Sequence, residues 1–318
     1  MSKFNLIKKI FLFFKLKRFL RFSKVKLNYS LKKLTSFKIG GKVDIIVTPS
    51  CLEDIFKCYK ILTRKKIPYF VLGNGTNILA SSKGFKGVII KLSNEFSHIY
   101  KMGNYLRVES GANLNKVIAF ARDNNLKGLE EGFGIPGTVG GAVYMNASSF
   151  SYSTQNVVSS VLAIINGKVT LLSNEDCKFS YRSSIFQSLD NPVILYVEFK
   201  LTKGNKDEIN EKMLEVINLR KLKQPSSFNA GSVFKQIENI NVSKLIDDSN
   251  FKGFSIGGAK VSDKHANFIE NINNATSKDV SKLIKTIQED IYNKHKIKLE
   301  TEIKFVGEKN GFWWLSYT

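Results

Sequence analysis

The segment EEGFGIPGTVGGAVYMNA, residues 130–147, constrains this chain more than any other part of its sequence. Five glycines and one proline lie within ten residues, namely Gly132, Gly134, Pro136, Gly137, Gly140 and Gly141. A connection between two elements needs far fewer glycines. Because glycine has no side chain, such a segment lets the backbone approach a flat ligand closely, and long loops of this kind usually carry function. We therefore expect a ligand-binding loop here.

A second glycine-rich segment, LGNGTNIL at 72–79, follows an apolar run that predicts a strand at Pro68–Leu72. Its two glycines favour a tight turn whose successive backbone N–H groups can hold a phosphate. It is neither a Walker A loop nor a Rossmann fingerprint, because the Gly-Lys-Ser/Thr, the third glycine and the following helix are missing. Alone, it fits a hairpin-like turn as well as a phosphate site. Two such loops in one domain favour a dinucleotide.

The length of 318 residues and the hydrophobic content of 43% predict one large or two ordinary globular domains. Three cysteines and three histidines are scattered along the chain without a CxxC pair. This pattern supports neither a disulfide framework nor a zinc site. We therefore expect no bound metal and a reducing compartment.

The net charge of +22 raises the question of nucleic-acid binding. Nine basic side chains lie in residues 1–28, which contain no acidic residue, and without them +13 remains over the other 290 residues. That remainder contains no RNP motif, zinc finger or basic zipper. We therefore expect no nucleic-acid partner. A basic surface also suits anionic ligands such as nucleoside diphosphates and carboxylates.

The first 28 residues form a basic and apolar N-terminal extension. Lysines interrupt every apolar run, so a membrane-spanning helix is not expected, and the segment makes a poor signal peptide. Ile7, Ile10, Phe11 and Phe14 would share one face of a helix, which allows weak contact with a membrane surface. The alternative is a disordered extension or a start codon placed too early.

Strand-like and helix-like segments follow one another without a regular βαβ repeat, which predicts an α+β fold with a boundary near residue 203. Thr276–His295 is a long amphipathic helix with Thr276 or Ser277 as its N-cap, and Ser50–Glu53 resembles a capping box that begins a helix ending near Lys66. The other expected helices are Asn113–Asn125, Asp207–Lys221 and Lys244–Asp248. The other expected strands are Val43–Thr48, Gly87–Leu92, Tyr105–Glu109, Val157–Ile165, Val169–Leu172, Val193–Leu201 and Ile297–Val306. Asn229–Lys235 is a loop-and-strand candidate, and Asn267–Glu270 is the expected start of a strand.

Six motifs in this order resemble the UDP-N-acetylenolpyruvoylglucosamine reductase family, over about Asn28 to Gly307. They are LGNGTNIL, the GIPGTVGGAVYMNA run, YRSSIFQ (181–187), NAGSVFK (229–235), IGGAKVSDKHANFI (256–269) and LETEIKFVG (299–307). The brief gap after YRSSIFQ resembles the shorter of two subclasses. The resemblance implies an FAD-binding PCMH-type domain of two α+β parts at 29–203 and a smaller α+β substrate-binding domain at 204–318.

By resemblance, the chain is a cytoplasmic enzyme, expected to be a monomer, that reduces the enolpyruvyl ether of UDP-N-acetylglucosamine to UDP-N-acetylmuramate for peptidoglycan. NADPH is the implied co-substrate and FAD the implied non-covalent cofactor. The implied catalytic residues are Arg182 and Glu302, which stabilise the intermediate, and Ser232, which protonates the substrate carbon. The implied FAD-binding residues are Gly73, Asn74, Gly75, Thr76, Asn77, Ile135, Pro136, Gly137, Thr138, Gly140, Gly141 and Asn146, and the implied substrate-binding residues are Tyr181, Lys235 and Gln236.

The chemistry of the three catalytic residues is consistent with these roles. A planar guanidinium suits a carboxylate that gains charge as hydride arrives. A serine is a poor acid in water, so its role requires a closely positioned site from which water is excluded. In a strand with period two, Glu302 would share a face with Lys298, Glu300 and Lys304, which could equally be a solvated face.

Three short segments depart from the family's pattern. Ser148–Ser151 replace the usual Gly-Ala-Tyr-Gly, Lys235–Ile237 replace Lys-Asn-Pro, and Val242-Ser243 replace Ala-Gly. None of these changes removes a catalytic residue, so activity is expected. The alternatives are another flavin enzyme of the same superfamily, such as an oxidase, and a degenerate binding protein or membrane-surface scaffold. Neither glycine-rich segment contains the His or Cys that would attach a flavin covalently in such an oxidase.

Overall fold

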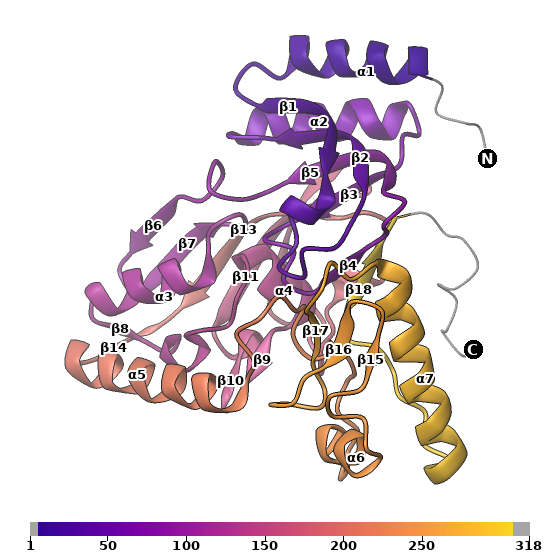
Figure 1. Cartoon of the computed structure of the whole chain (residues 1–318). Helices are drawn as coiled ribbons and strands as arrows, with labels where there is room; N and C mark the ends of the chain where they lie inside the picture. The colour runs from indigo at the N-terminus through magenta and orange to yellow at the C-terminus, as the bar shows by residue number, and fades with distance from the viewer. Residues whose placement is uncertain (1–5, 308–318) are drawn as a thin grey trace. The chain divides into compact units, whose positions relative to one another are not determined.

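The structure of the chain is a computed structural model that describes residues 6–307 (Figure 1). The chain forms two compact units. The first comprises the residues up to Leu27, Ile45–Asn74 and Gly87–Arg220. The second comprises Asn28–Asp44, Gly75–Lys86 and the residues from Lys221 onward. The chain therefore passes between the units several times. Three of these passages occur within strands at Lys24–Ser30, Lys42–Thr48 and Phe85–Lys91, which belong to one sheet.

The first part of the first unit combines two helices with a four-stranded sheet. The sheet has the order β1-β2-β5-β3, and β3 and β5 are parallel. Leu12 and Leu16 of the first helix are buried with Ile55 and Leu62 of the second. The elements are α1 (Leu6–Phe19), α2 (Leu52–Arg64), β1 (Lys24–Ser30), β2 (Lys42–Thr48), β3 (Tyr69–Leu72) and β5 (Phe85–Lys91).

The second part of the first unit is an antiparallel sheet of order β12-β11-β13-β7-β6 that shares a core with three helices. Val117, Val143 and Met213 bring one side chain of each helix into this core. The main elements are β6 (Ile99–Met102), β7 (Tyr105–Glu109), α3 (Leu114–Asp123), α4 (Val139–Met145), β11 (Val158–Ile165), β12 (Lys168–Ser173), β13 (Val193–Lys200) and α5 (Lys206–Lys223). Two short pairs join β8 (Leu126–Lys127) to β14 (Thr202–Lys203) and β9 (Ser148–Ser149) to β10 (Tyr152–Ser153).

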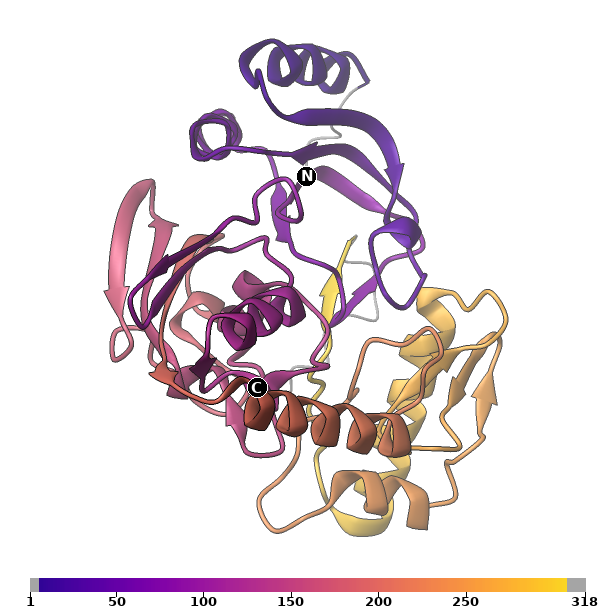
Figure 2. The ribbon, with the colours of Figure 1, turned by 90° about the vertical axis from the view of Figure 1, so that its left-hand side faces the viewer.

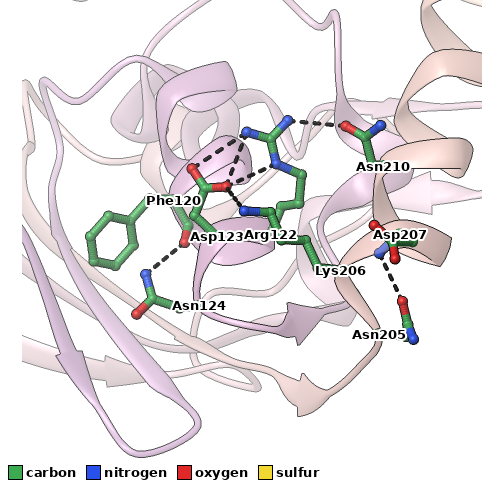
Figure 3. Close-up of polar contacts among 8 residues, drawn as sticks. All are labelled: Phe120, Arg122, Asp123, Asn124, Asn205, Lys206, Asp207 and Asn210. Carbon is green, nitrogen blue, oxygen red and sulfur yellow. Dashed lines mark hydrogen bonds and ion pairs between the residues drawn. The ribbon is translucent and has the colours of Figure 1, made fainter.

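Polar contacts fasten the start of α5 to the end of α3 (Figure 3). Arg122 donates a hydrogen bond from Nη1 to Oδ1 of Asn210 at 3.1 Å, and Lys206 Nζ lies 3.1 Å from the Asp123 carboxylate. The first turns of α5 are therefore fixed on α3, and Arg220 lies in the last turn of the same helix.

The second unit has a three-stranded sheet, β15-β16-β17, and a separate parallel pair of β4 and β18. Its long helix begins with a capping box, in which Thr276 Oγ1 accepts from the Asp279 N–H and the Asp279 carboxylate accepts from the Thr276 N–H. Phe234, Ile246 and Leu283 lie in its core. The elements are β4 (Ile78–Ala80), α6 (Val242–Asp248), β15 (Ser255–Ile256), β16 (Ala259–Val261), β17 (Ile269–Asn271), α7 (Ser277–His295) and β18 (Lys304–Val306).

The predicted α+β class is confirmed, and most predicted helices and strands occur within a few residues of their expected bounds. The compact units differ from a single division at residue 203, because most of α5 belongs to the first unit and residues 28–44 and 75–86 belong to the second. The functional domains 29–203 and 204–318 therefore stay a prediction.

Two local predictions are wrong. The segment Ser50–Glu53 does not form a capping box, because the N-cap of α2 is Cys51, the Ser50 hydroxyl donates to the Phe22 carbonyl and Glu53 pairs with Lys57. The closing strand covers Lys304–Val306 instead of Ile297–Val306. Its expected alternation holds for Leu299 and Ile303, which are buried, and then fails because Phe305 is exposed and Val306 is buried.

A disordered extension is also wrong for residues 6–27. They form helix α1 and most of strand β1, and α1 contacts α2 (Figures 1 and 2). Its Leu12 and Leu16, and Leu20 just beyond it, are at most 2% exposed. The N-terminal region is therefore part of the folded first unit.

Leu16→Ala is expected to lower the free energy of unfolding by about 2–5 kcal/mol, because removing a buried leucine leaves a cavity. Phe14→Ala is the matched control, since Phe14 is 63% exposed on the same helix, and its effect should stay within about 0.5 kcal/mol. Urea unfolding followed by far-UV circular dichroism measures both. Equal stabilities of the two variants would contradict the packing of α1 into the core.

Candidate active site

The first glycine-rich segment begins where strand β3 ends. Leu72 pairs with Lys91 of β5, and the Lys91 ammonium donates a hydrogen bond to the Gly73 carbonyl. Burial disfavours the charged form and lowers the pKa of Lys91 to about 8. A cationic group is therefore held directly beside the segment that was predicted to bind a phosphate.

The two glycine-rich segments meet inside the first unit. A Cβ atom on Gly73 would lie 2.4 Å from Oγ1 of Thr138, so only glycine fits there. Thr138 is the N-cap of α4 and accepts from the Gly141 N–H at 3.3 Å. The expected proximity of the two segments is therefore present.

Two glycines of the second segment, Gly140 and Gly141, differ in whether packing against neighbouring atoms explains them. A Cβ on Gly140 would lie 2.9 Å from the Cβ of Ser110, and the Gly140 N–H donates to the Ser110 carbonyl at 2.8 Å. Gly140 is therefore required by packing. A Cβ on Gly141 would meet nothing closer than Thr138 Oγ1 at 3.5 Å, so packing does not explain this glycine.

The beginning of the second segment is held by Asn115 of α3. Its Oδ1 accepts from the Gly134 N–H at 2.6 Å and its Nδ2 donates to the Ile135 carbonyl at 3.1 Å. Pro136, the next residue, is exposed, and Gly137 has a φ of 141°. The backbone of this turn is thus fixed by one side chain and leaves its outer surface open.

Asn146 ends α4 in the left-handed conformation, with φ 42°. Its buried side chain donates to Gln155 Oε1 and to the Ser180 carbonyl, and it accepts from the Ser153 hydroxyl and the Gln155 N–H. An amide has two N–H donors and two acceptor lone pairs, so all are used within the protein. Any contact of Asn146 with FAD would have to come from its backbone.

Arg182 occupies a tight turn that α4 holds in place. Ser180 and Ser183 exchange two backbone hydrogen bonds of 3.1 Å around it, and Gln187 Nε2 donates to the carbonyls of both Arg182 and Tyr144 at 2.9 Å. Arg182 has a φ of 54°, a conformation that costs a residue with a side chain roughly 1–2 kcal/mol. Backbone strain of this kind is concentrated at functional sites.

The guanidinium of Arg182 is directed by Ser148, one of the departures from the family pattern, and lies close to Tyr181 of the YRSSIFQ motif. Nη1 donates to the Ser148 carbonyl at 2.8 Å and also to the Ser148 hydroxyl. The Tyr181 ring centre lies 5.3 Å from the Arg182 Cζ, and the Tyr181 side chain is half exposed. Ser148 thus contributes a hydroxyl acceptor that the usual glycine would lack.

Arg220 of α5 was not among the residues predicted from the sequence. It is 7% exposed, its Nε donates to the Phe133 carbonyl at 3.0 Å, and its guanidinium lies 5.4 Å from the ring centre of Phe150. Within residues 6–307 its Nη2 is buried without a hydrogen-bond partner. Burial lowers the pKa of Arg220 to about 10. The only signal in the sequence was an arginine near the end of a helix, which is too common to be informative.

In the second unit, the NAGSVFK segment pairs with the segment that contains Glu302. The Glu302 N–H donates to the Val233 carbonyl at 2.7 Å and the Lys235 N–H donates to the Glu300 carbonyl at 2.9 Å. Asn267 also binds this segment, since its side chain exchanges hydrogen bonds with the N–H and carbonyl of Phe234. Ser232 and Glu302 are therefore close along paired backbones.

The end of the first glycine-rich segment joins this arrangement within the second unit. Asn77 Nδ2 donates to the Glu302 carbonyl at 3.2 Å, and the Lys304 N–H donates to the Asn77 carbonyl at 2.9 Å. Gly75 has a φ of 63°, and a Cβ there would lie 2.4 Å from the Leu34 carbonyl oxygen. The fold therefore requires a glycine at position 75, whatever ligand binds. Thr76 lies between Gly75 and Asn77 in the chain.

The predicted substrate-binding residues lie in different surroundings. Lys235 Nζ is 3.0 Å from the exposed Glu300 carboxylate. Gln236 lines an open polar cavity of about 550 Å³ with Ser243 and His265, whose pKa is lowered by burial. The departures at Gln236 and Ser243 therefore alter one and the same cavity.

Comparisons with known proteins decide the family. The model of the UDP-N-acetylenolpyruvoylglucosamine reductase C-terminal domain matches residues 223–306, and the model of an FAD binding domain matches residues 43–172. The UDP-N-acetylenolpyruvoylglucosamine reductase of Caldanaerobacter subterraneus subsp. tengcongensis is 43% identical over 297 residues, which are 93% of this chain and 98% of that protein. The chain belongs to the UDP-N-acetylenolpyruvoylglucosamine reductase family.

Other reductases of the family agree with this result. The protein of Clostridium novyi is 40% identical over 298 residues, 93% of this chain and 96% of that protein. The solved reductase of Thermus caldophilus matches with a TM-score of 0.77 and 32% identity, covering 89% of this chain and 98% of that one. The chain is thus an FAD-containing reductase of peptidoglycan synthesis, and the oxidase and binding-protein alternatives are disfavoured.

The residues present fit a flat, anionic dinucleotide. Gly141 leaves space next to the backbone, the Lys91 ammonium lies beside Gly73, and Arg220 carries a buried N–H group without a partner among the described residues. Lys91 and Arg220 are cationic groups that could neutralise phosphate or flavin charge. The individual FAD contacts remain predictions.

The substitution Gly141→Ala tests whether Gly141 is needed for FAD binding or for the stability of the fold. The change should keep or raise the stability of the apoprotein, by up to about 1 kcal/mol, because alanine favours the helix and meets open space. It should weaken FAD binding at least tenfold if a flat ligand approaches this backbone (an order-of-magnitude expectation). Thermal unfolding and flavin fluorescence titration measure the two quantities.

Gly140→Ala is the control for that experiment, because its new methyl group would collide with Ser110 and should destabilise the apoprotein itself. A Gly141→Ala protein that binds FAD with wild-type affinity would remove Gly141 from the site.

The affinity for FAD should fall as pH rises through about 8, the pKa of Lys91. An anion beside Gly73 favours the ammonium, so binding above this pH requires uptake of a proton. Lys91→Arg keeps its charge and should abolish the decrease, while Lys91→Gln should bind FAD weakly at every pH. Titrations between about pH 7 and pH 9 test this, and the same pH profile in all three proteins would refute the role of Lys91.

Proposed function

We propose that the chain is the NADPH-dependent reductase that converts the enolpyruvyl ether of UDP-N-acetylglucosamine into UDP-N-acetylmuramate, with Arg182, Ser232 and Glu302 as its catalytic residues. The observation that carries the assignment of roles is the backbone pairing in the second unit, in which Val233 and Glu302 are hydrogen-bonded at 2.7 Å. A proton donor and a carboxylate on paired segments can act on one substrate.

Ser232 would donate the proton to the carbon that bears the ether oxygen and carboxylate. Its neighbours Val233 and Phe234 are buried and both bind Asn267, so the segment is held rigidly on both sides. A serine hydroxyl is a weak acid, so it transfers a proton only when the distance is short and water is excluded. Rigid support of this kind is what such a donor requires.

Glu302 and Arg182 would stabilise the enolate-like intermediate. The Arg182 fork is directed by Ser148, so it is preorganised to bind a carboxylate that gains charge. Glu302 lies near Lys304, whose pKa is lowered mainly by burial and also by Lys235, while Glu302 opposes this decrease. Glu302 and Lys304 are therefore close enough to interact electrostatically.

FAD, when bound, supplies the hydride that adds to the CH2 carbon of the enolpyruvyl group, and NADPH restores it. Lys91, Thr138, Gly140 and Gly141 of the first unit would hold the dinucleotide, with backbone from Gly73-Asn74 and Ile135–Gly137. Gly75, Thr76, Asn77 and the backbone of Asn146 complete the predicted set. Tyr181, Lys235 and Gln236 would bind the UDP-sugar.

The remaining expectations about partners belong to the same proposal. We expect a monomeric, cytoplasmic enzyme without a nucleic-acid partner, and a weak contact of residues 1–28 with a membrane surface. None of the helices in residues 6–307 has the length and apolar composition needed to cross a bilayer.

Ser232→Ala should leave the reduction of bound flavin by NADPH intact and slow the reoxidation by substrate at least about 100-fold, because only the second half-reaction needs the proton donor. Stopped-flow absorbance of the two half-reactions under anaerobic conditions measures this. Ser226→Ala, at an exposed serine of the same chain segment, is the matched control and should behave as wild type. Rapid reoxidation of the Ser232→Ala protein would exclude the assignment.

A further inference from the structure

Helix α1 has two apolar faces on opposite sides. Helical periodicity places Leu12 and Leu16 on the side that is buried in the core, and it places Ile7, Phe11 and Phe14 on the other side. These three side chains are 74%, 62% and 63% exposed, respectively. The sequence predicted the face of Ile7, Phe11 and Phe14. The structure shows in addition that this face is exposed, while Leu12 and Leu16 on the opposite face anchor the helix in the core.

The exposed face, which we call the outer face of α1 (Ile7, Ile10, Phe11 and Phe14), is surrounded by cations. Lys8 and Lys15 lie along one edge of this face and Lys17 lies along the other edge. Arg18 lies one helical turn beyond Phe14, at the C-terminal end of the face. At the end of the neighbouring helix α2, Arg64 is exposed. Just beyond the helix, Lys65 Nζ lies 5.3 Å from the ring centre of Phe11, and Lys66 is exposed.

The acidic groups nearby do not neutralise these cations. Glu53 is paired with Lys57, and Asp54 accepts from the Phe22 N–H and the Ser23 hydroxyl. Among the residues that the structure describes, Lys8, Lys15, Lys17 and Arg18 form no ion pair with a carboxylate. The outer face therefore combines exposed aromatic rings with an uncompensated positive charge.

We propose that the outer face of α1 binds the surface of an anionic lipid bilayer, with its phenylalanine rings at the boundary between headgroups and acyl chains. This inference deepens the proposed membrane contact of residues 1–28. Apolar side chains flanked by Lys and Arg are the signature of a helix that lies in this interface, and anionic lipids attract such basic segments. A second copy of the chain fits this face poorly, because it would bring two like-charged surfaces together.

The buried leucines determine how such binding works. Because Leu12 and Leu16 hold α1 in the core, the helix is already formed before it meets the lipid, and the first unit is fixed on the membrane rather than tethered to it. Deleting residues 1–28 would expose the partners of these leucines. Point substitutions on the outer face are therefore the better test.

The full-length protein is mixed with vesicles of phosphatidylcholine alone or with phosphatidylglycerol, and the bound fraction is measured by co-sedimentation. The wild type should bind only the anionic vesicles, and less well at high salt. Phe11→Ser/Phe14→Ser should weaken binding at least about tenfold, and Lys8→Gln/Lys15→Gln/Arg18→Gln should do the same.

The matched controls remove equal groups elsewhere on the first unit. Val169→Ser/Leu171→Ser removes apolar side chains that are 51% and 66% exposed, and Lys101→Gln/Lys168→Gln/Lys200→Gln removes three exposed lysines. Both controls should bind as the wild type does. If the control variants lost as much vesicle binding as the test variants, net charge or general hydrophobicity would explain the effect. That result would overturn the proposal.

Two further measurements separate lipid binding from self-association and from the reductase activity. Light scattering shows whether the outer face instead joins two copies, and a dimer that Phe11→Ser/Phe14→Ser dissociates would also overturn the proposal. Reductase turnover in solution should be unchanged in this variant, because α1 contains none of the proposed site residues. Failure of lipid binding would leave the reductase assignment intact, and a protein that lacks reductase activity could still bind lipid.

Discussion

The close backbone contact between Gly140 and Ser110 fixes the position of helix α4, and the arrangement of the first unit's site depends on that helix. At its start, Thr138 touches Gly73 and brings the two glycine-rich segments together. At its end, Asn146 and Tyr144 hold the turn that contains Arg182. A short helix that could not approach Ser110 so closely would displace both the proposed cofactor loop and the proposed catalytic arginine.

The departures from the family pattern are concentrated at groups that support the site and leave the proposed catalytic residues in place. Ser148 directs Arg182, and Phe150 of the same hairpin packs on Arg220. Gln236 and Ser243 line a single cavity of the second unit. The family chemistry can therefore be retained while these supporting contacts differ from those of a chain with the usual residues.

The parts of the fold that could be predicted are those in which local and tertiary preferences agree. The amphipathic pattern after Thr276 predicted the correct helix and N-cap, because the capping residues and the buried face coincide. Ser50–Glu53 failed because tertiary partners, the Phe22 carbonyl and Lys57, use the two side chains that a capping box needs. The closing strand failed because residues before Lys304 bind the NAGSVFK segment at isolated positions instead of a continuous ladder.

The site residues also divide into those that the sequence could predict and those that depend on tertiary neighbours. The second glycine-rich segment was recognisable because an ordinary connection rarely needs so many glycines in ten residues, although the structure assigns its Gly140 to packing, as it does Gly75 of the first segment. Lys91 and Arg220 could not be recognised, since a lysine at a strand end and an arginine in a helix have no distinguishing pattern. Their significance comes from burial and from their neighbours, Gly73 and Phe133, which are distant in sequence.

In the proposed reaction, one bound flavin carries electrons from NADPH to the enolpyruvyl group of a UDP-sugar. The most direct test is the absorbance of the purified holoprotein under anaerobic conditions. We expect NADPH to bleach the flavin spectrum, and the enolpyruvyl ether of UDP-N-acetylglucosamine to restore it with formation of one UDP-N-acetylmuramate per flavin. A flavin that dioxygen reoxidises but this substrate does not would contradict the account.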